Sequence, residues 1–354
     1  MSSSTLGPPS TPSAQTTSPP VSAPTRPPAS ARGRVARRIV AAMLLVTGLL
    51  TLSYAGLSTY IATQIVYTAP EPILITPADY ALRYHDVTFT SRDDGLVLRG
   101  WFIPGILPDG TLTAERTIIV VPGGQQNRTD VHGGALSVSA DLARNGFAVL
   151  AYDPRGTGNS QAAPFSMGYF EQRDVLGAVD FLRTGKLPYP ELGHPRIIGA
   201  WGVSTGATSA LLAAAQEPAI RAVVSDTASA QAVPLLEQQI IERSGLPAFV
   251  VPGSLVAARV LYGIDYYAVR PVDVVDRLAP RPVFFIHGDH DPWLPISNMT
   301  ALVQAAETGQ GAQVQSWVVP GVPDHAQAFH TAPVEYMHRV LAFFTASLGP
   351  SGGK

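Results

Sequence analysis

The chain has no cysteine among its 354 residues. This absence excludes a disulfide scaffold, a thiolate zinc site, an iron–sulfur cluster and a cysteine nucleophile. Charged residues are scarce at 14%, against a usual share of about a quarter, whereas hydrophobic residues make up 46%. A formal net charge of −2 gives no argument for a nucleic-acid partner. The composition also excludes a chain that is disordered over its full length.

Acidic residues are missing from the first 70 positions, where every charge is an arginine. Residues 1–31 are rich in proline, serine and threonine. Such a segment buries too little apolar surface to offset the entropy lost on ordering, so we predict a disordered tail over residues 1–31.

Residues 39–66 form a run of 28 residues without a charge, preceded by an arginine-rich flank. A helix of this length measures about 42 Å and crosses a hydrocarbon core of roughly 30 Å. We therefore predict a basic flank and a transmembrane helix over residues 32–66, followed by a linker over residues 67–84. The flank places the N-terminus in the cytoplasm and the body of the chain outside it. The alternatives are a signal peptide cleaved near Ser53-Tyr54-Ala55 and a buried core helix.

From His85 onward, short runs rich in valine and isoleucine alternate with helical patterns. Such alternation predicts an α/β domain over residues 85–348, with a mostly parallel eight-stranded sheet flanked by helices. The long apolar segment of residues 227–279, which we call the cap, predicts a small helical insertion. Residues 349–354 are assigned to a tail. We predict the strands over residues 85–90, 96–102, 117–121, 147–152, 196–201, 220–225, 282–286 and 313–319.

The segment Gly202-Val203-Ser204-Thr205-Gly206 matches the pattern G-x-S-x-G. A strand pattern precedes it and an Ala/Leu-rich helical pattern follows it, which is the setting of a nucleophile elbow. Small residues on both sides let the chain turn sharply and present the serine hydroxyl. The alternative is a turn of small residues in which the serine only caps the helix.

A nucleophilic serine needs a histidine base and an acid that orients the histidine. In chain order the acid and then the histidine are expected after the serine. Two segments offer them just beyond predicted strands, where the sites of α/β sheets lie. One contains His287, Asp289, His290 and Asp291, and the other contains His325.

These features together resemble the α/β-hydrolases, most closely the membrane-anchored serine hydrolases of the esterase, lipase and aminopeptidase type. The resemblance covers about residues 85–348 and implies Ser204 as nucleophile, Asp291 as acid and His325 as base. It also implies an oxyanion hole formed by the backbone N–H groups of Thr205 and Gly124. The family usually has His-Gly where this chain has Pro122-Gly123. The motifs that carry the resemblance are Val121-Pro122-Gly123-Gly124, residues 152–160, the Ser204 elbow, residues 287–295 and His325.

Several alternatives compete for these roles. Asp226 follows a predicted strand and is an alternative acid, and His330 is an alternative histidine. The segment from His287 to Asp291 also has the residue types of a metal site. Asp153 and Arg155 are expected to hold their own loop.

The sequence therefore predicts a membrane-bound serine hydrolase that cleaves a carboxylic ester or a related acyl bond of a small-molecule substrate. No metal and no cofactor are expected, and nucleic acid is not an expected partner. Within the cap, Phe249 and Tyr266 are expected to set the preference for acyl length. Acyl transfer or peptide cleavage by the same residues, and an inert interaction module on the same fold, are the alternatives.

Overall fold

The structure is a computed structural model that describes Gly7 and residues 31–349. The predicted tails at residues 1–31 and 349–354 lie outside the described residues, apart from Gly7, Ala31 and Gly349. The chain divides into two compact units, Met1–Leu52 and Ser53–Lys354.

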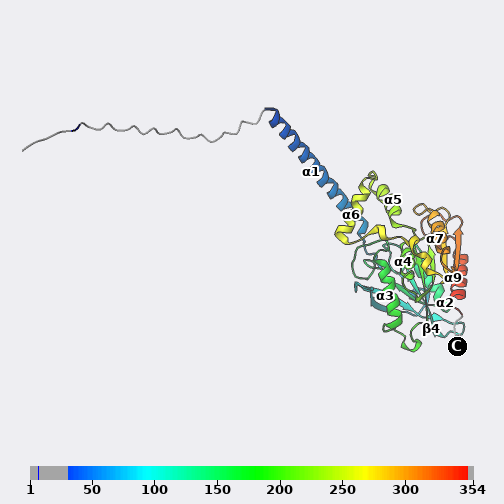
Figure 1. Cartoon of the computed structure of the whole chain (residues 1–354). Helices are drawn as coiled ribbons and strands as arrows, with labels where there is room; N and C mark the ends of the chain where they lie inside the picture. The colour runs from blue at the N-terminus through cyan, green and yellow to red at the C-terminus, as the bar shows by residue number, and fades with distance from the viewer. Residues whose placement is uncertain (1–6, 8–30, 350–354) are drawn as a thin grey trace, which may run out of the picture. The chain divides into compact units, whose positions relative to one another are not determined.

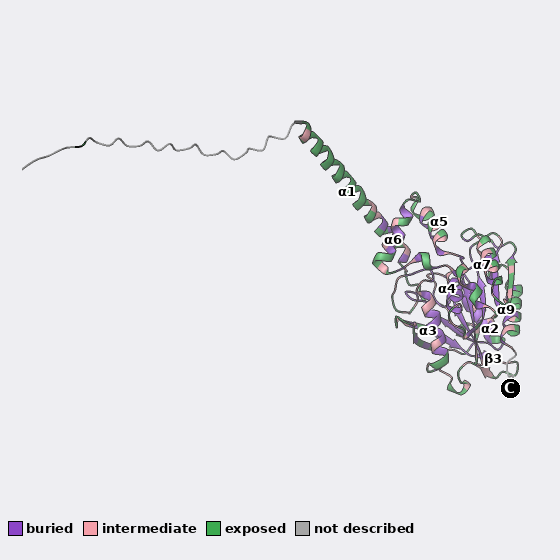
Figure 2. Cartoon of the chain, viewed as in Figure 1, coloured by how far each residue is buried: buried purple, intermediate pink, exposed green. Residues whose placement is uncertain are grey.

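The described part of the first unit belongs, beyond Gly7, to helix α1 (Ala31–Val66), which continues into the second unit. Helix α1 starts before the apolar run because the arginine-rich flank is helical as well, and alanine and arginine are strong helix formers. Residues 34–53 are exposed along its whole circumference (Figure 2). Among the described residues, α1 is the one helix that is long and apolar enough to cross a membrane.

The second unit is built on an eight-stranded sheet with the order β1-β2-β6-β5-β7-β8-β9-β10. The pairs β1–β2 and β2–β6 are antiparallel, and all other pairs are parallel. The predicted fold class, an α/β-hydrolase fold with a mostly parallel sheet, is therefore confirmed. The strands are β1 (His85–Thr90), β2 (Val97–Ile103), β5 (Arg116–Val121), β6 (Ala148–Tyr152), β7 (Ile197–Val203), β8 (Ile220–Asp226), β9 (Val283–Gly288) and β10 (Val314–Val319).

Helices cover both faces of this sheet, which is why its central strands are continuous apolar runs (Figure 1). One face packs against α3 (Glu171–Thr184), α4 (Thr205–Ala214) and α7 (Ser297–Glu307). The other face packs against α2 (Ala135–Arg144) and α9 (Pro333–Leu348). Every residue of β5, β6 and β9 is buried.

Shorter elements lie at the edges of this core. The pair β3 (Gly105–Ile106) and β4 (Leu112–Thr113) forms a separate two-stranded sheet. Helix α8 (Ala328–Thr331) precedes α9, and the single-turn helices are η1 (Pro77–Tyr80) and η2 (Pro190–Leu192).

The cap contains α5 (Ala232–Ser244), α6 (Val250–Tyr262) and three single turns, η3 (Tyr266–Ala268), η4 (Pro271–Asp273) and η5 (Val275–Leu278). Helices α5 and α6 form a separate apolar cluster, to which the last turns of α1 also belong. Ile61, Ala62 and Val66 of α1 are buried in this cluster beside Leu236 and Val251 of the cap.

Candidate active site

Ser204 lies in a sharp turn between the end of β7 and the start of α4. Its φ of 53° and ψ of −122° lie outside the ordinary regions for a residue with a side chain, so the turn is strained. Glycine is required on both sides for steric reasons. A Cβ at Gly202 would lie 2.6 Å from the backbone of Gly206, and a Cβ at Gly206 would collide with Val121. The sequence motif therefore corresponds to an elbow that projects Ser204 from the carboxyl end of β7.

Ser204, His325 and Asp291 form one hydrogen-bonded chain. Ser204 Oγ lies 2.8 Å from His325 Nε2, and His325 Nδ1 lies 2.8 Å from Asp291 Oδ2. The backbone N–H groups of Trp293 and Leu294 donate to the other carboxylate oxygen of Asp291, at 2.9 and 2.8 Å. The structure thus brings together three residues that lie 121 and 34 positions apart in the sequence.

The charge state of Asp291 follows from these contacts. Burial acts to raise its pKa, but the hydrogen bond and charge of His325 and the two backbone donors outweigh burial and hold the pKa below its ordinary value. The carboxylate is therefore ionised at neutral pH and accepts a hydrogen bond from Nδ1–H of His325.

The alternative residues have other partners. Asp226 accepts hydrogen bonds from Tyr336 and Thr227, and burial raises its pKa to about 6 despite them. The ring of His330 contacts the carbonyl of Val131.

The histidines and aspartates between residues 287 and 291, which were an alternative metal site, also face different groups. His287 binds the carbonyl of Leu294, and Asp289 accepts from the backbone of Gly321 and Val322. His290 pairs with Asp289, while Asp291 faces His325. Within the described part of the chain, no group of three or more histidine or acidic side chains is placed to hold a metal ion.

The loop after β5 brings Gly124 next to the elbow. A Cβ at Gly124 would lie 2.8 Å from both Thr205 Oγ1 and the ring of Phe165, so a larger residue would have to displace one of these side chains or the loop. The N–H of Thr205 is in the first turn of α4, where helices have no internal partner for it. The buried carboxylate of Asp130 accepts from Gly123 N–H at 2.7 Å and fixes the loop.

A cavity of about 1270 Å³ lies over Ser204. Its floor contains Ser204, Thr205, Gly124 and His325, and Trp293 stacks on the His325 ring at 5.1 Å. Two walls come from helices outside the sheet domain's core. Helix α1 contributes Leu57, Tyr60, Ile61, Gln64 and Ile65, and the cap contributes Leu235, Leu236, Gln239, Ile240, Arg243, Ser244 and Leu246.

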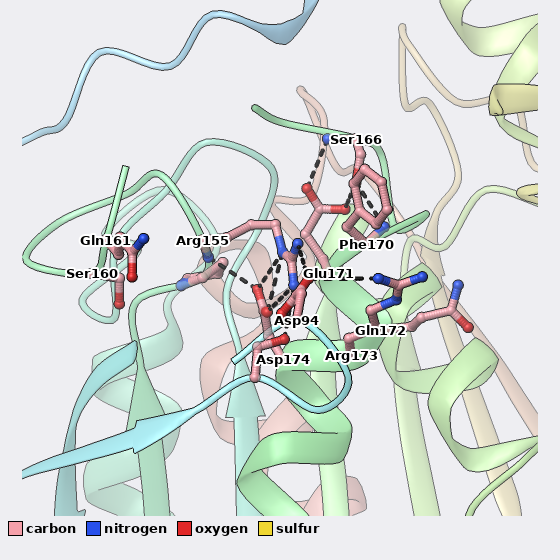
Figure 3. Close-up of polar contacts among 12 residues, drawn as sticks. Asp94, Arg155, Ser160, Gln161, Ser166, Phe170, Glu171, Gln172, Arg173 and Asp174 are labelled. Carbon is pink, nitrogen blue, oxygen red and sulfur yellow. Dashed lines mark hydrogen bonds and ion pairs between the residues drawn. The ribbon is translucent and has the colours of Figure 1, made fainter. Parts of the chain in front are cut away.

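A third wall, which contains Phe165 and Met167, comes from the loop between β6 and α3. Ion pairs of the buried Arg155 and hydrogen bonds to Glu171 hold this loop (Figure 3). Arg155 binds Asp174 at 2.6 Å and Asp94 at 2.9 Å, and the carboxylate of Glu171 accepts from the backbone of Ser166. These contacts lie within the loop and its neighbours, as expected for Arg155.

Sequence reasoning missed several of these groups. Asp130 belongs to no motif, and Trp293 lies in the segment of residues 287–295 without having been assigned a role. The wall formed by α1 lies about 140 residues before Ser204 in the sequence. Phe249 and Tyr266, which were expected to set the preference for acyl length, do not line the cavity. Phe249 is exposed, and Tyr266 is buried with its hydroxyl on the carbonyl of Phe165. The side chains of the cap that do face Ser204 come mainly from α5.

Comparison with known proteins places the chain in a family. The model of the prolyl oligopeptidase family matches residues 136–351, more than half of the chain. Among solved structures, the esterase Pf2001 of Pyrococcus furiosus superimposes with a TM-score of 0.64 at 22% identity, covering 80% of this chain and 99% of that one. That similarity shows the fold.

Two curated relatives are similar over part of their length. The uncharacterized protein YqkD of Bacillus subtilis (strain 168) is 28% identical over 162 residues, which are 45% of this chain and 51% of the relative. Thiohydrolase aneE of Aspergillus aculeatus is 28% identical over 187 residues, 45% of this chain and 57% of the relative. The chain thus spans about half the length of these relatives. Through the family match and the shared fold, the chain belongs to the prolyl oligopeptidase family of α/β-fold hydrolases.

Proposed function

We propose that the protein is a serine hydrolase that cleaves a carboxylic ester, with Ser204 as nucleophile, His325 as general base and Asp291 as the orienting acid. The observation that carries the proposal is the hydrogen-bonded chain from Ser204 to Asp291 on the floor of a cavity. An ionised Asp291 holds Nδ1–H of His325, which leaves Nε2 free to accept the proton of Ser204.

The reaction runs in two halves. Ser204 Oγ attacks the acyl carbonyl while His325 Nε2 takes its proton, and the oxyanion is stabilised by the backbone N–H groups of Thr205 and Gly124. His325 then returns the proton to the leaving alcohol, which gives an acyl-enzyme. Water activated by His325 releases the acid and regenerates Ser204. Loss of one oxyanion donor typically costs about 3–4 kcal/mol in the transition state.

The cavity favours an acyl chain as the group that is recognised. Two of its walls contain aliphatic side chains of α1 and α5 beside polar ones such as Gln64, Gln239 and Arg243. Burial of an acyl chain against the aliphatic side chains removes apolar surface from water and so favours binding. Thioesters are the second candidate class, because a relative of this chain is named a thiohydrolase. The same three residues would also serve peptide cleavage or transfer of the acyl group to an acceptor other than water.

The test is a series of p-nitrophenyl esters of increasing acyl length with the wild-type protein and with Ser204→Ala. We expect Ser204→Ala to reduce hydrolysis to near background and to abolish labelling by a fluorophosphonate probe, with an unchanged melting temperature. A tenth of the wild-type rate in Ser204→Ala would refute the nucleophile assignment. A wild-type protein that is folded yet neither labelled nor active would favour an inert interaction module.

We further propose that α1 anchors the protein in a membrane, with the N-terminus in the cytoplasm and the hydrolase domain outside. The arginines before residue 39 and the absence of a basic residue between Arg38 and Arg83 support this orientation. Retention of α1 is supported by Tyr54, whose hydroxyl donates to Phe249 O at 2.8 Å. A cleavage after Ala55 would remove this contact.

The orientation is tested by C-terminal fusions in bacteria. We expect an alkaline phosphatase fusion to be active and a green fluorescent protein fusion to be dark. The reverse pattern would invert the topology. A soluble mature protein that begins near Gly56 would identify α1 as a signal peptide.

A further inference from the structure

The level at which α1 leaves the membrane follows from its length. The arginine flank ends at Arg38, and a hydrocarbon core of roughly 30 Å takes about 20 residues of helix. A span that begins at Ile39 therefore ends near Ser58. With α1 as the proposed anchor, the remaining turns, up to Val66, would lie at and beyond the outer surface of the bilayer.

Helix α6 of the cap lies alongside this end of the span. Gly253 N–H donates to Tyr54 Oη at 3.1 Å, and a Cβ at Gly253 would collide with Ser58 Oγ, so the two helices are in close contact. Further along both helices, Thr63 Oγ1 lies 3.0 Å from Tyr262 Oη. The two helices thus run in the same direction, and the start of α6 lies level with Tyr54, within the predicted span.

The cap presents an apolar surface at this level. The turn from residue 245 to 249 has the sequence Gly-Leu-Pro-Ala-Phe and carries no charge. The side chain of Phe249 is 62% exposed, and Val256 and Val260 on the same helical stripe are 60% and 76% exposed. Single exposed apolar residues are common, but a contiguous group beside a membrane-spanning helix indicates contact with lipid.

The cavity above Ser204 meets the same surface. The residues of α1 that line it, Leu57 to Ile65, follow helical spacing and continue directly from the end of the span. Leu246, in the apolar turn of the cap, lines the cavity as well. One side of the cavity is therefore built from groups at the surface of the bilayer.

We propose that the turn of residues 245–249 and the exposed stripe of α6 insert into the outer leaflet, and that the substrate is a long-chain acyl ester dissolved in the membrane. The acyl chain passes from the lipid along α1 and Leu246 to Ser204 without crossing bulk water. The choice of substrate rests on the proposed hydrolase function, whereas the insertion of the cap rests on the proposed membrane anchor.

Insertion is tested first, without reference to activity. Because the chain has no cysteine, Ala248→Cys in the full-length protein takes an environment-sensitive nitrobenzoxadiazole dye at one position. In phosphatidylcholine vesicles that contain lipids with nitroxide-labelled acyl chains, we expect blue-shifted emission and strong quenching. The matched control is Val334→Cys on α9, a position that is 84% exposed. Quenching that is equal at the two positions, or absent at residue 248, would overturn the proposal.

The substrate class is tested with two esters that share a leaving group. The full-length protein in phosphatidylcholine vesicles receives 4-methylumbelliferyl palmitate in the lipid or 4-methylumbelliferyl acetate in the water. Charges introduced at a membrane surface weaken insertion, so we expect the variant Ala248→Asp with Val256→Asp to hydrolyse palmitate about tenfold more slowly and acetate at the wild-type rate. The control Val334→Asp should change neither rate.

The outcomes separate the two proposals. An equal loss on both esters, or no loss on palmitate, would show that the substrate does not enter from the lipid. A wild-type protein that cleaves neither ester faster than Ser204→Ala would refute the hydrolase function and with it the substrate class. The dye experiment decides on insertion of the cap in either case.

Discussion

Replacing Asp291 with asparagine tests the proposed catalytic chain at its least exposed member, whose side chain is 1% exposed. Asp291 uses both carboxylate oxygens: Oδ1 accepts from the N–H groups of Trp293 and Leu294, and Oδ2 faces His325 Nδ1. An asparagine must place its carbonyl on one side and its amide on the other. The two backbone donors determine which side is chosen.

Keeping the carbonyl oxygen on Trp293 and Leu294 retains two hydrogen bonds, each with a net contribution of about 1 kcal/mol. The amide of asparagine then points at His325 Nδ1, so that Nδ1 must accept and the proton moves to Nε2. His325 would carry N–H toward Ser204 and lose its capacity as a base. In the serine-protease example the same substitution lowers kcat about 10⁴-fold, and we expect a loss of that order here.

The assay is kcat on a water-soluble p-nitrophenyl ester, with the melting temperature as a check on folding. The matched control is Asp289→Asn two residues earlier. Asp289 accepts from the backbone of Gly321 and Val322 and has no contact with His325, so we expect less than a tenfold loss. Equal losses in the two variants would show that the tautomer argument is wrong and that both carboxylates act only on the loops.

Three further outcomes are expected. Gly124→Ala should lower kcat on the order of 10²–10³-fold, because the Cβ would lie 2.8 Å from Thr205 Oγ1 and displace the proposed donor. In the control Gly56→Ala no heavy atom lies within 4 Å, and an equal loss there would contradict the assignment. Leu235→Trp should narrow the cavity and shift the acyl-length optimum for soluble esters to shorter chains, whereas Phe249→Ala should leave the optimum unchanged. A shift only in the second variant would place the pocket elsewhere. Burial raises the pKa of Asp226 from 3.8 to about 6, so the folded state binds the carboxyl proton more tightly than the unfolded state does. The stability that this protonation contributes is complete below pH 3.8 and is lost as the pH rises through about 6. In urea unfolding, the decrease in the free energy of unfolding between pH 4 and pH 7 should be smaller by about 2 kcal/mol in Asp226→Asn than in the wild-type protein, and identical pH profiles would exclude the effect.

The sheet could be predicted from the sequence because its strands are short, β-branched and bounded by turns. Each of the eight predicted strands begins and ends within two residues of the bounds of a strand in the sheet. Local patterns suffice for strands that are buried on both faces. The antiparallel hairpin at the start was likewise marked by the turn Ser91-Arg92-Asp93-Asp94-Gly95 between two apolar runs.

A site residue could be predicted from the sequence only where a catalytic residue type stands just after a predicted strand. Ser204, Asp291 and His325 each follow a strand, and their roles remain predictions that the variants above test. Asp130 gave no signal, because a buried aspartate that accepts two backbone N–H groups resembles any loop aspartate in the sequence. The cavity walls were also hidden, because apolar residues of α5 have the same spacing whether they face a core or a substrate.

The last turns of helix α1 belong to the hydrolase unit and form part of the cavity wall. Phe165, which lines the cavity, donates its backbone N–H to the carbonyl of Val66 at 3.0 Å. A truncated protein that starts at residue 67 would lose this contact, one wall of the cavity and the partners of the apolar cluster around Leu236. A chain that starts at Ser53 keeps all three. We therefore expect the longer chain to cleave soluble esters at near the full-length rate, and the shorter chain to lose that activity and to aggregate. Equal activity of the two truncated proteins would show that α1 is only a tether, and the cavity would then require other walls.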